Sequence, residues 1–188
     1  MEWHNLFANW EIKFVAVALI VAAWIDGKQL KVPNWFTAPM VLSGLIYHSC
    51  VGGLGQWNDG GFLGSFVAMW VGFFSLIWIY AMGGMGAGDV KLLMGVGAWV
   101  HPTLTFYGFC VSTVVGAVLA IAMVLARKKW QKHYGQFWGI LTEIMVIRNP
   151  NELATIAAER KSSMMLLPYG IPIAIGTIAY FAWRGLLL

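Results

Sequence analysis

Charged residues are scarce in this chain of 188 residues. Asp, Glu, Lys and Arg make up only 11% of it, whereas 60% of the residues are hydrophobic and 11 are tryptophan. Ordinary soluble domains carry about 25% charged residues, so this composition excludes that class of protein. The apolar runs are continuous and do not alternate with polar residues, which excludes a membrane β-barrel. We therefore predict an all-α, polytopic membrane protein.

Cysteine is also nearly absent. Cys50 and Cys110 lie inside apolar segments and form no CxxC pair, so no disulfide framework or zinc site is expected. The sequence contains no HExxH motif, which argues against a metal-dependent protease. Its four histidines are scattered, and no serine or cysteine accompanies one in a recognisable catalytic motif. We expect neither a metal nor a cofactor.

The apolar sequence divides into six expected transmembrane helices. A helical span needs roughly 20 apolar residues, and we place the spans at 6–25, 37–54, 61–82, 86–101, 103–126 and 166–187. The fourth and fifth are separated only by His101-Pro102, where proline disfavours helix in the residue before it. Hydropathy alone also allows one long tilted helix there.

The positions of the basic residues favour six spans. With six, ten of the twelve Lys and Arg residues fall on one side of the membrane: Lys28, Lys31, Lys91, Arg127, Lys128, Lys129, Lys132, Arg148, Arg160 and Lys161. Only Lys13 and Arg184 remain on the other side. The positive-inside rule makes the first side cytoplasmic and both chain termini extracytoplasmic. No basic region precedes the first span, so we expect no cleaved signal peptide, and the basic residues form no stripe suited to nucleic acid.

We expect a single membrane domain over residues 1–188, with one long cytoplasmic loop at 127–165. Phe137, Leu141, Ile144 and Met145 recur in that loop at helical spacing, which indicates a helix lying on the membrane surface. A simple connector that happens to be amphipathic is the alternative. A second short helix is expected at 152–161, with Asn151 as its cap.

Two aspartates stand out because they border apolar sequence at the cytoplasmic ends of spans. They are Asp26 and Asp89, and ionisable groups at such depth are functional candidates. Asp26 has an alternative explanation as a solvated residue near Lys28, and Asp89 as a helix N-cap. However, the glycines at 83, 84, 86 and 88 exceed what a cap requires, and glycine permits close approach by another chain, such as a peptide substrate.

Two carboxylates held close together cannot both ionise easily, so the pair retains a proton and titrates as a unit. Such a pair supplies a general base and a general acid. It can activate water against a peptide carbonyl and protonate the leaving amine. The predicted topology puts Asp26 and Asp89 on the same face of the membrane, which permits this chemistry.

Three sequence elements resemble one protein family. Residues 86–91 read GAGDVK, which fits GxGDxK; residues 26–37 read DGKQLKVPNWFT; and residues 168–172 read PYGIP. Together they resemble the type IV prepilin peptidases, the GxGD membrane aspartyl proteases that remove leader peptides from prepilins. The three elements occur in the family's order and extend from the first expected span to the last.

The resemblance implies roles for individual residues. Asp26 and Asp89 become the catalytic pair, and Gly86, Gly88 and Lys91 form the substrate side. The remaining motif residues are structural: Pro33, Asn34, Thr37, Pro168, Gly170 and Pro172. We further expect Thr37 to cap the second span, which would place Pro39 in its first turn.

The implied reaction is a cut in a prepilin or pseudopilin, after a glycine, between a basic leader and an apolar helix. It would occur at the cytoplasmic face of the inner membrane. Many family members also methylate the new N-terminus and carry a domain with paired CxxC motifs, which are missing here. The chain therefore resembles the short, peptidase-only form found with tight-adherence (Flp-type) pilus systems, and the expectation does not extend to methyl transfer.

Two other functions also fit intramembrane aspartates. One is a small proton-coupled transporter or channel subunit, a class that often shows an inverted repeat, and we find no such repeat here. The other is a non-catalytic membrane assembly factor.

Overall fold

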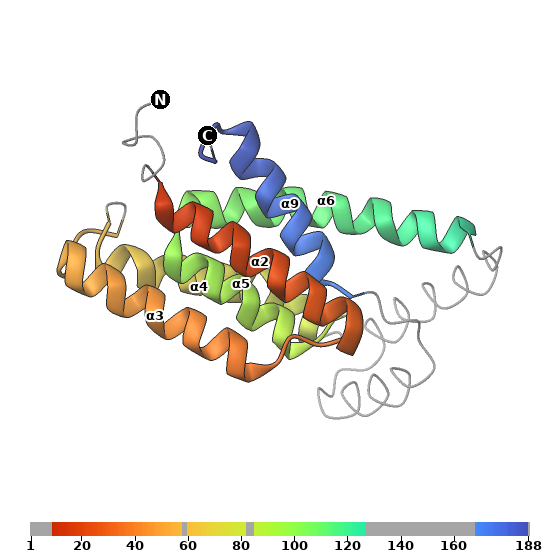
Figure 1. Cartoon of the computed structure of the whole chain (residues 1–188), viewed down its shortest axis with the longest axis horizontal. Coiled ribbons are helices and arrows are strands. Elements are labelled where there is room, and N and C mark those ends of the chain that lie inside the picture. The colour runs from red at the N-terminus through yellow and green to blue at the C-terminus, as the bar shows by residue number, and fades with distance from the viewer. Residues whose placement is uncertain (1–8, 58–59, 82–84, 127–167, 188) are drawn as a thin grey trace, which may run out of the picture.

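The computed structural model describes residues 9–57, 60–81, 85–126 and 168–187 (Figure 1). Within these ranges the regular structure consists of six helices and no strand, which confirms the all-α prediction for this part of the chain. They are α2 (Trp10–Gln29), α3 (Asn34–Gly52), α4 (Phe62–Ala81), α5 (Ala87–Trp99), α6 (Pro102–Ala126) and α9 (Gly170–Trp183). The loop at 127–165, with both helices expected in it, lies outside the described residues, as do Gly83 and Gly84.

The break at His101-Pro102 is present. Helix α5 ends at Trp99, and its C-cap Val100 is extended, with φ −126° and ψ 172°. Helix α6 then begins at Pro102. Proline suits the first position of a helix, because the N–H that it lacks would have no intrahelical partner there. The alternative of one long helix over this stretch is therefore wrong.

The start of α3 corrects one expectation. Its N-cap is Pro33, which is extended at φ −75° and ψ 150°, and the helix begins at Asn34. The Thr37 N–H already donates to the Pro33 carbonyl at 3.2 Å, as an interior helical residue does. Thr37 is thus in the first turn and is not the cap, and Pro39 lies inside the helix. The expectation was wrong because Pro33 itself fixes the extended backbone that precedes the helix.

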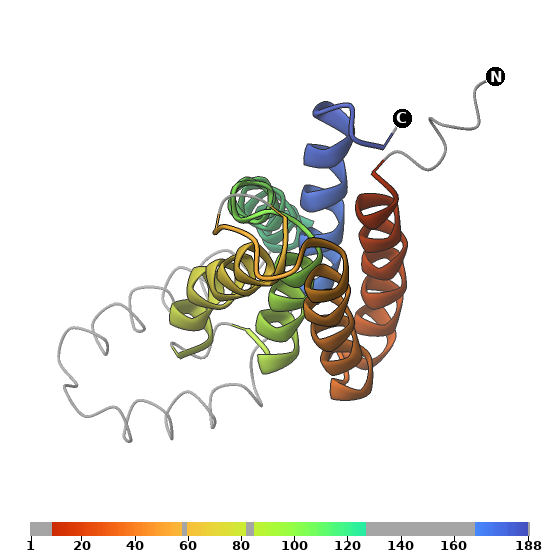
Figure 2. The ribbon, with the colours of Figure 1, turned by 90° about the vertical axis from the view of Figure 1, so that its left-hand side faces the viewer.

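Helix α5 is the centre of the bundle. It packs against α3 and α4, and it also touches α2, α6 and α9 (Figures 1 and 2). The Trp99 indole N–H donates to the Met40 carbonyl at 2.9 Å, and Ser65 Oγ donates to the Ala98 carbonyl at 2.5 Å. A Cβ on Gly97 would overlap the Ala68 carbonyl of α4. Glycine at this position therefore lets α4 and α5 approach until their backbones meet.

The direction of the helices decides where the acidic residues lie. Helix α9 packs along α6 and α2. The first turn of α2 and the last turn of α9 lie at the same end of the bundle (Figure 1). Asp26, in the last turn of α2, lies toward the opposite end, near the beginning of α9. The bundle thus brings residues from the two ends of the sequence together.

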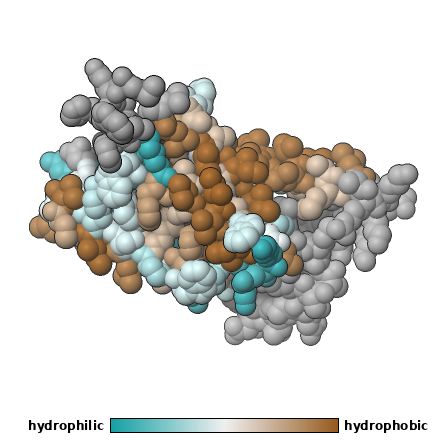
Figure 3. Space-filling model, viewed as in Figure 1, coloured by the Kyte–Doolittle hydropathy of each residue, from teal (hydrophilic) through white to brown (hydrophobic). Residues whose placement is uncertain are grey.

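Large apolar side chains are exposed on most of the helices. Trp24, Trp35, Trp78 and Trp183 are 65%, 70%, 71% and 81% exposed, and apolar residues cover much of the face in Figure 3. By length and composition, two of the described helices, α4 and α6, could cross a membrane, and α9 is a shorter apolar helix. Helix α5 has 13 residues, and its rise of about 20 Å is less than the roughly 30 Å of a bilayer core.

Candidate active site

Asp26 occupies the last turn of α2 and is buried, with 2% of its surface exposed. Its Oδ2 accepts a hydrogen bond of 2.7 Å from the backbone N–H of Gly170. Gly170 is the first residue of α9, so the carboxylate faces the N-terminus of that helix. A helix N-terminus presents free N–H groups and a partial positive charge, both of which favour an anion. The beginning of α9 is therefore a stabilising partner for the Asp26 carboxylate.

A steric constraint explains why position 170 is a glycine. A Cβ built there would lie 2.8 Å from Asp26 Oδ2 and 3.1 Å from Asp26 Cγ. No real Cβ tolerates a carboxyl group so close without one of the two moving. Glycine at position 170 thus leaves room for the direct contact between the α9 backbone and the acid, and its motif neighbours are placed around that contact. Pro168 accepts a hydrogen bond from the Ile171 N–H at 3.2 Å, and Pro172 is buried in the first turn of α9.

Asp89 is the third residue of α5 and is 5% exposed. Its Oδ2 accepts from the backbone N–H of Gly86 at 3.2 Å, and Gly86 is the N-cap. This is the half of a capping box in which the third residue of a helix reaches back to the cap. The capping explanation for Asp89 therefore holds in altered form: Asp89 is not the N-cap, but its carboxylate satisfies one of the orphan N–H groups at the helix start.

Two adjacent residues lie near the acids. The Gly170 N–H bonds to Asp26, and the side chain of Tyr169, one residue earlier, lies within electrostatic range of Asp89. The segment that begins α9 thus contacts Asp26 through the backbone of Gly170. Both acids approach this segment from helices distant in the sequence, α2 and α5. The region carries two buried carboxyl groups around one dipeptide.

The two motif glycines near Asp89 differ in their surroundings. A Cβ on Gly88 would overlap the carbonyl of Val32, in the turn between α2 and α3. The close approach that the sequence led us to expect from another chain is therefore occupied at Gly88 by this chain's own backbone. Among the described residues, a Cβ on Gly86 would meet Asp89 Oδ2 at 3.3 Å and the Gly88 nitrogen at 3.9 Å. Of the two, Gly86 has the more open surroundings.

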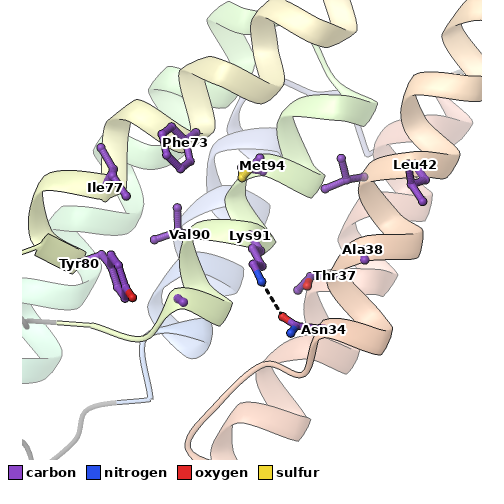
Figure 4. Close-up of a pocket in the computed structure, with 12 residues that line it drawn as sticks. Asn34, Thr37, Ala38, Leu42, Phe73, Ile77, Tyr80, Val90, Lys91 and Met94 are labelled. Atoms are coloured by element: carbon purple, nitrogen blue, oxygen red, sulfur yellow. Dashed lines mark hydrogen bonds between the residues drawn. The ribbon is translucent and has the colours of Figure 1, made fainter. Parts of the chain in front are cut away.

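Lys91 points away from Asp89. At 3.6 residues per turn, the two are separated by about 200° around the helix; Asp89 is buried and Lys91 is exposed. Lys91 Nζ donates to Asn34 Oδ1 at 2.9 Å, which ties α5 to the start of α3 (Figure 4). The motif segments around Asn34 and Asp89 are thus joined directly. No local sequence pattern predicts this pairing, because the partners are 57 residues apart.

A cavity opens beside Tyr169. It has a volume of about 240 Å³ and lies between α4, α6 and the beginning of α9. Its wall includes Tyr169, Pro172, Met85, Phe109 and Gly116. Tyr169, which lines this cavity, directly precedes Gly170, the residue that bonds to Asp26.

The chemistry that this region offers is that of two carboxyl groups. Within the described ranges, no three His, Cys, Asp or Glu side chains converge as metal ligands would. Paired carboxyls in an enclosed site can share one proton and act as base and acid in turn. Such a pair could activate a water molecule.

Comparison with known proteins points to one family of leader peptidases. The model of the type IV leader peptidase family matches residues 13–121, more than half of the chain, including Asp26 and the GAGDVK segment. The chain is 29% identical over 119 residues to the prepilin leader peptidase/N-methyltransferase of Aeromonas hydrophila, covering 60% of this chain and 39% of the relative. For the Neisseria gonorrhoeae protein of the same name, identity is 34% over 123 residues, covering 58% and 38%.

An archaeal protein is similar as well. The preflagellin peptidase of Methanocaldococcus jannaschii is 29% identical over 107 residues, covering 55% of this chain and 42% of the relative. The aligned regions thus span about two fifths of the length of these curated relatives. No solved structure matches the chain.

Proposed function

Because the chain belongs to the type IV leader peptidase family, we propose that it is an aspartic endopeptidase with Asp26 and Asp89 as its catalytic pair. The observation that carries this proposal is that both acids are buried and that Asp26 accepts a 2.7 Å hydrogen bond from Gly170, whose neighbour Tyr169 lies within electrostatic range of Asp89. Two buried carboxyls beside the same segment suit an acid–base pair.

In the proposed reaction the pair holds one proton between its two carboxyls. The ionised member takes a proton from water, and the resulting hydroxide adds to the scissile carbonyl. The protonated member gives its proton to the leaving amine as the C–N bond breaks. Gly170 positions Asp26 through the 2.7 Å hydrogen bond, and Gly86 positions Asp89 through the 3.2 Å hydrogen bond.

The proposed substrate is a prepilin or pseudopilin, cut after a glycine between a basic leader and an apolar helix. The relatives' names support this class, since they are prepilin and preflagellin peptidases. The apolar cavity beside Tyr169 offers a place for the apolar residues next to the cut. The proposal covers peptide cleavage alone and leaves out the methyl transfer that the bacterial relatives' names include.

We place the protein in the cytoplasmic membrane as one six-span domain. The acids would then lie at the cytoplasmic face, and both termini would be extracytoplasmic. Support comes from the buried carboxyls combined with exposed tryptophans, which is the reverse of a water-soluble surface. The shared end of the first turn of α2 and the last turn of α9 agrees with an even number of crossings (Figure 1).

The test is to co-express the chain with a candidate prepilin and follow loss of the leader. Asp26→Asn and Asp89→Asn should each lower the cleavage rate by at least about 10²-fold, the contribution typical of a general acid or base. Glu11→Gln is the matched control, because Glu11 accepts from the Tyr47 hydroxyl at 2.9 Å on the first turn of α2, and an amide oxygen can still accept that bond. Wild-type cleavage by either aspartate variant would exclude the aspartyl mechanism.

A further inference from the structure

A second, larger cavity lies on the other side of α5. It is an open groove of about 560 Å³ between α3 and α4, with α5 as its floor (Figure 4). Its lining residues on α5 are Ala87, Val90, Lys91 and Met94, a helical stripe roughly opposite Asp89. The groove therefore does not open onto the acidic region, and the proposed reaction does not account for it.

The groove is polar at one end and apolar along the rest. On α3 its lining residues recur at helical spacing, in the order Asn34, Thr37, Ala38, Val41 and Leu42. Lys91 and Asn34 form their hydrogen bond at the polar end, and Tyr80 lies at the end of α4 on the same side (Figure 4). Farther in, Phe73 and Ile77 of α4 face Leu42 across the groove (Figure 4). The polarity thus falls from a cation, through a hydroxyl, to aliphatic and aromatic side chains.

Thr37 gives a second, independent sign of a ligand. Its side chain is fully buried and lines the groove. Its Oγ1 has no hydrogen-bond partner among the residues that the structure describes. A buried hydroxyl without a partner carries an uncompensated desolvation penalty, and a ligand oxygen next to it would remove that penalty. This hydroxyl lies one turn of α3 inward from Asn34.

The charge of the groove favours one of two occupants. A substrate with a basic leader would bring positive charge to Lys91, which lines the groove. An acyl chain is narrow enough to lie along the groove, and it leaves the polar end for a headgroup.

We propose that this groove binds one anionic phospholipid. The phosphate accepts hydrogen bonds from Lys91 Nζ and the Asn34 side-chain amide, the Thr37 hydroxyl donates to an ester carbonyl, and one acyl chain lies between Val41, Leu42 and Phe73. Among the residues that the structure describes, no acidic side chain lines the groove, so no carboxylate there would pair with the ammonium group of a zwitterionic lipid. The inference depends on the membrane location proposed above and is independent of the cleavage reaction.

The experiment is native mass spectrometry of the purified full-length chain in detergent, titrated with phosphatidylglycerol or phosphatidylcholine that carry the same acyl chains. The wild type should prefer phosphatidylglycerol. Lys91→Gln should weaken phosphatidylglycerol binding about fivefold, which corresponds to roughly 1 kcal/mol for one basic residue. It should weaken phosphatidylcholine binding less, because the choline ammonium already offsets the charge of that lipid's phosphate. Thr37→Val, which keeps the volume and removes the hydroxyl, should weaken both lipids because both carry the ester.

Matched variants separate this site from general charge attraction. Lys28→Gln makes the same charge change at the end of α2, where Lys28 lies over the Trp24 ring and outside the groove, and should bind phosphatidylglycerol as the wild type does. Lys91→Arg keeps the charge and should retain binding. Circular dichroism checks that each variant is folded.

Three outcomes would overturn the proposal. Equal affinity for both lipids would remove the anionic preference, and equal losses in Lys28→Gln and Lys91→Gln would show a nonspecific charge effect. Displacement of the lipid by glycerol 3-phosphate at the same concentration would show an anion site without an acyl chain. None of these results depends on cleavage, so a failure here is distinguishable from a failure of the peptidase proposal.

Discussion

Gly170 is the residue on which the geometry of the candidate site depends most directly. Its N–H holds the Asp26 carboxylate, and its missing side chain leaves the space that the carboxylate fills. A hydrogen bond of this kind fixes an acid in position as well as stabilising its charge. The residue thus combines a steric requirement with an electrostatic one.

We predict that Gly170→Ala lowers prepilin cleavage by about 10²-fold, because a new Cβ 2.8 Å from Asp26 Oδ2 forces the carboxyl group to move, and a displacement near 1 Å can cost that much. The processed fraction of prepilin at matched enzyme levels measures the effect. The control is Gly27→Ala, beside Asp26, whose Cβ would meet, among the described residues, Ile171 Cδ1 at an ordinary 3.7 Å. Equal cleavage by the two variants would contradict a positioning role for Gly170.

Individual residues also show where sequence reasoning reaches its limit. The sequence pointed to Asp26, Asp89 and Gly170, because motif residues and their spacing can be recognised from the sequence alone. It could not identify Val32 as the neighbour of Gly88, or Asn34 as the partner of Lys91. Such contacts are decided by how helices pack, and no local pattern encodes them. The Thr37 expectation failed for a local reason, since Pro33 already supplied the extended residue before α3.

At the scale of elements, α5 is the unusual helix. It is short, and its residues from Gly95 to Trp99 are all buried. Its neighbours approach it through backbone contacts at glycine: a Cβ on Gly44 of α3 would lie 2.6 Å from the Ala98 carbonyl, and one on Gly72 of α4 would lie 2.5 Å from the Leu93 carbonyl. The helix that carries Asp89 is therefore held by close packing on two sides.

This packing predicts that Gly97→Ala destabilises the protein by about 1–3 kcal/mol, the usual cost of overpacking, since the new methyl group would overlap the Ala68 carbonyl. A thermal unfolding experiment in detergent should show a lower midpoint. Gly116→Ala serves as the comparison, because its Cβ would meet Pro172 Cβ at 3.5 Å, an ordinary contact, and alanine favours a helix interior by up to about 1 kcal/mol. An unchanged midpoint for Gly97→Ala would show that α4 and α5 separate at little cost.

The sequence predicted the existence of all six described helices and the break between α5 and α6. Continuous apolar runs, and a proline that cannot follow a helical residue easily, are strong local signals. The boundaries were less well predicted: the first span was expected at 6–25, whereas α2 is Trp10–Gln29 and includes Asp26. Hydropathy ends a span at the first charged residue, but the backbone continues as helix for another turn and buries that residue.

For the whole molecule, the proposed topology makes a prediction about accessibility. In a background with Cys50 and Cys110 replaced by serine, Leu30→Cys and Ala87→Cys should react with an impermeant thiol reagent only from the cytoplasmic side. Trp57→Cys and Leu186→Cys should react only from the outside, because the positive-inside rule orients every loop together. Labelling of intact cells and of inverted vesicles distinguishes the two sides. Reaction of positions 30 and 87 from opposite sides would separate Asp26 from Asp89 and overturn the proposed site.

The hydrogen bond between Gly170 and Asp26 has a consequence for biosynthesis. A ribosome makes the chain from its N-terminus, and Gly170 follows Asp26 by 144 residues. While the earlier helices emerge, the Asp26 carboxylate lacks the Gly170 N–H from which it later accepts a hydrogen bond. The arrival of α9 is thus the event that completes its surroundings. Because translation runs from the N-terminus, the beginning of α9 is made after all the other described helices. A chain arrested before Gly170 would contain both acids but would lack the N–H that bonds to Asp26.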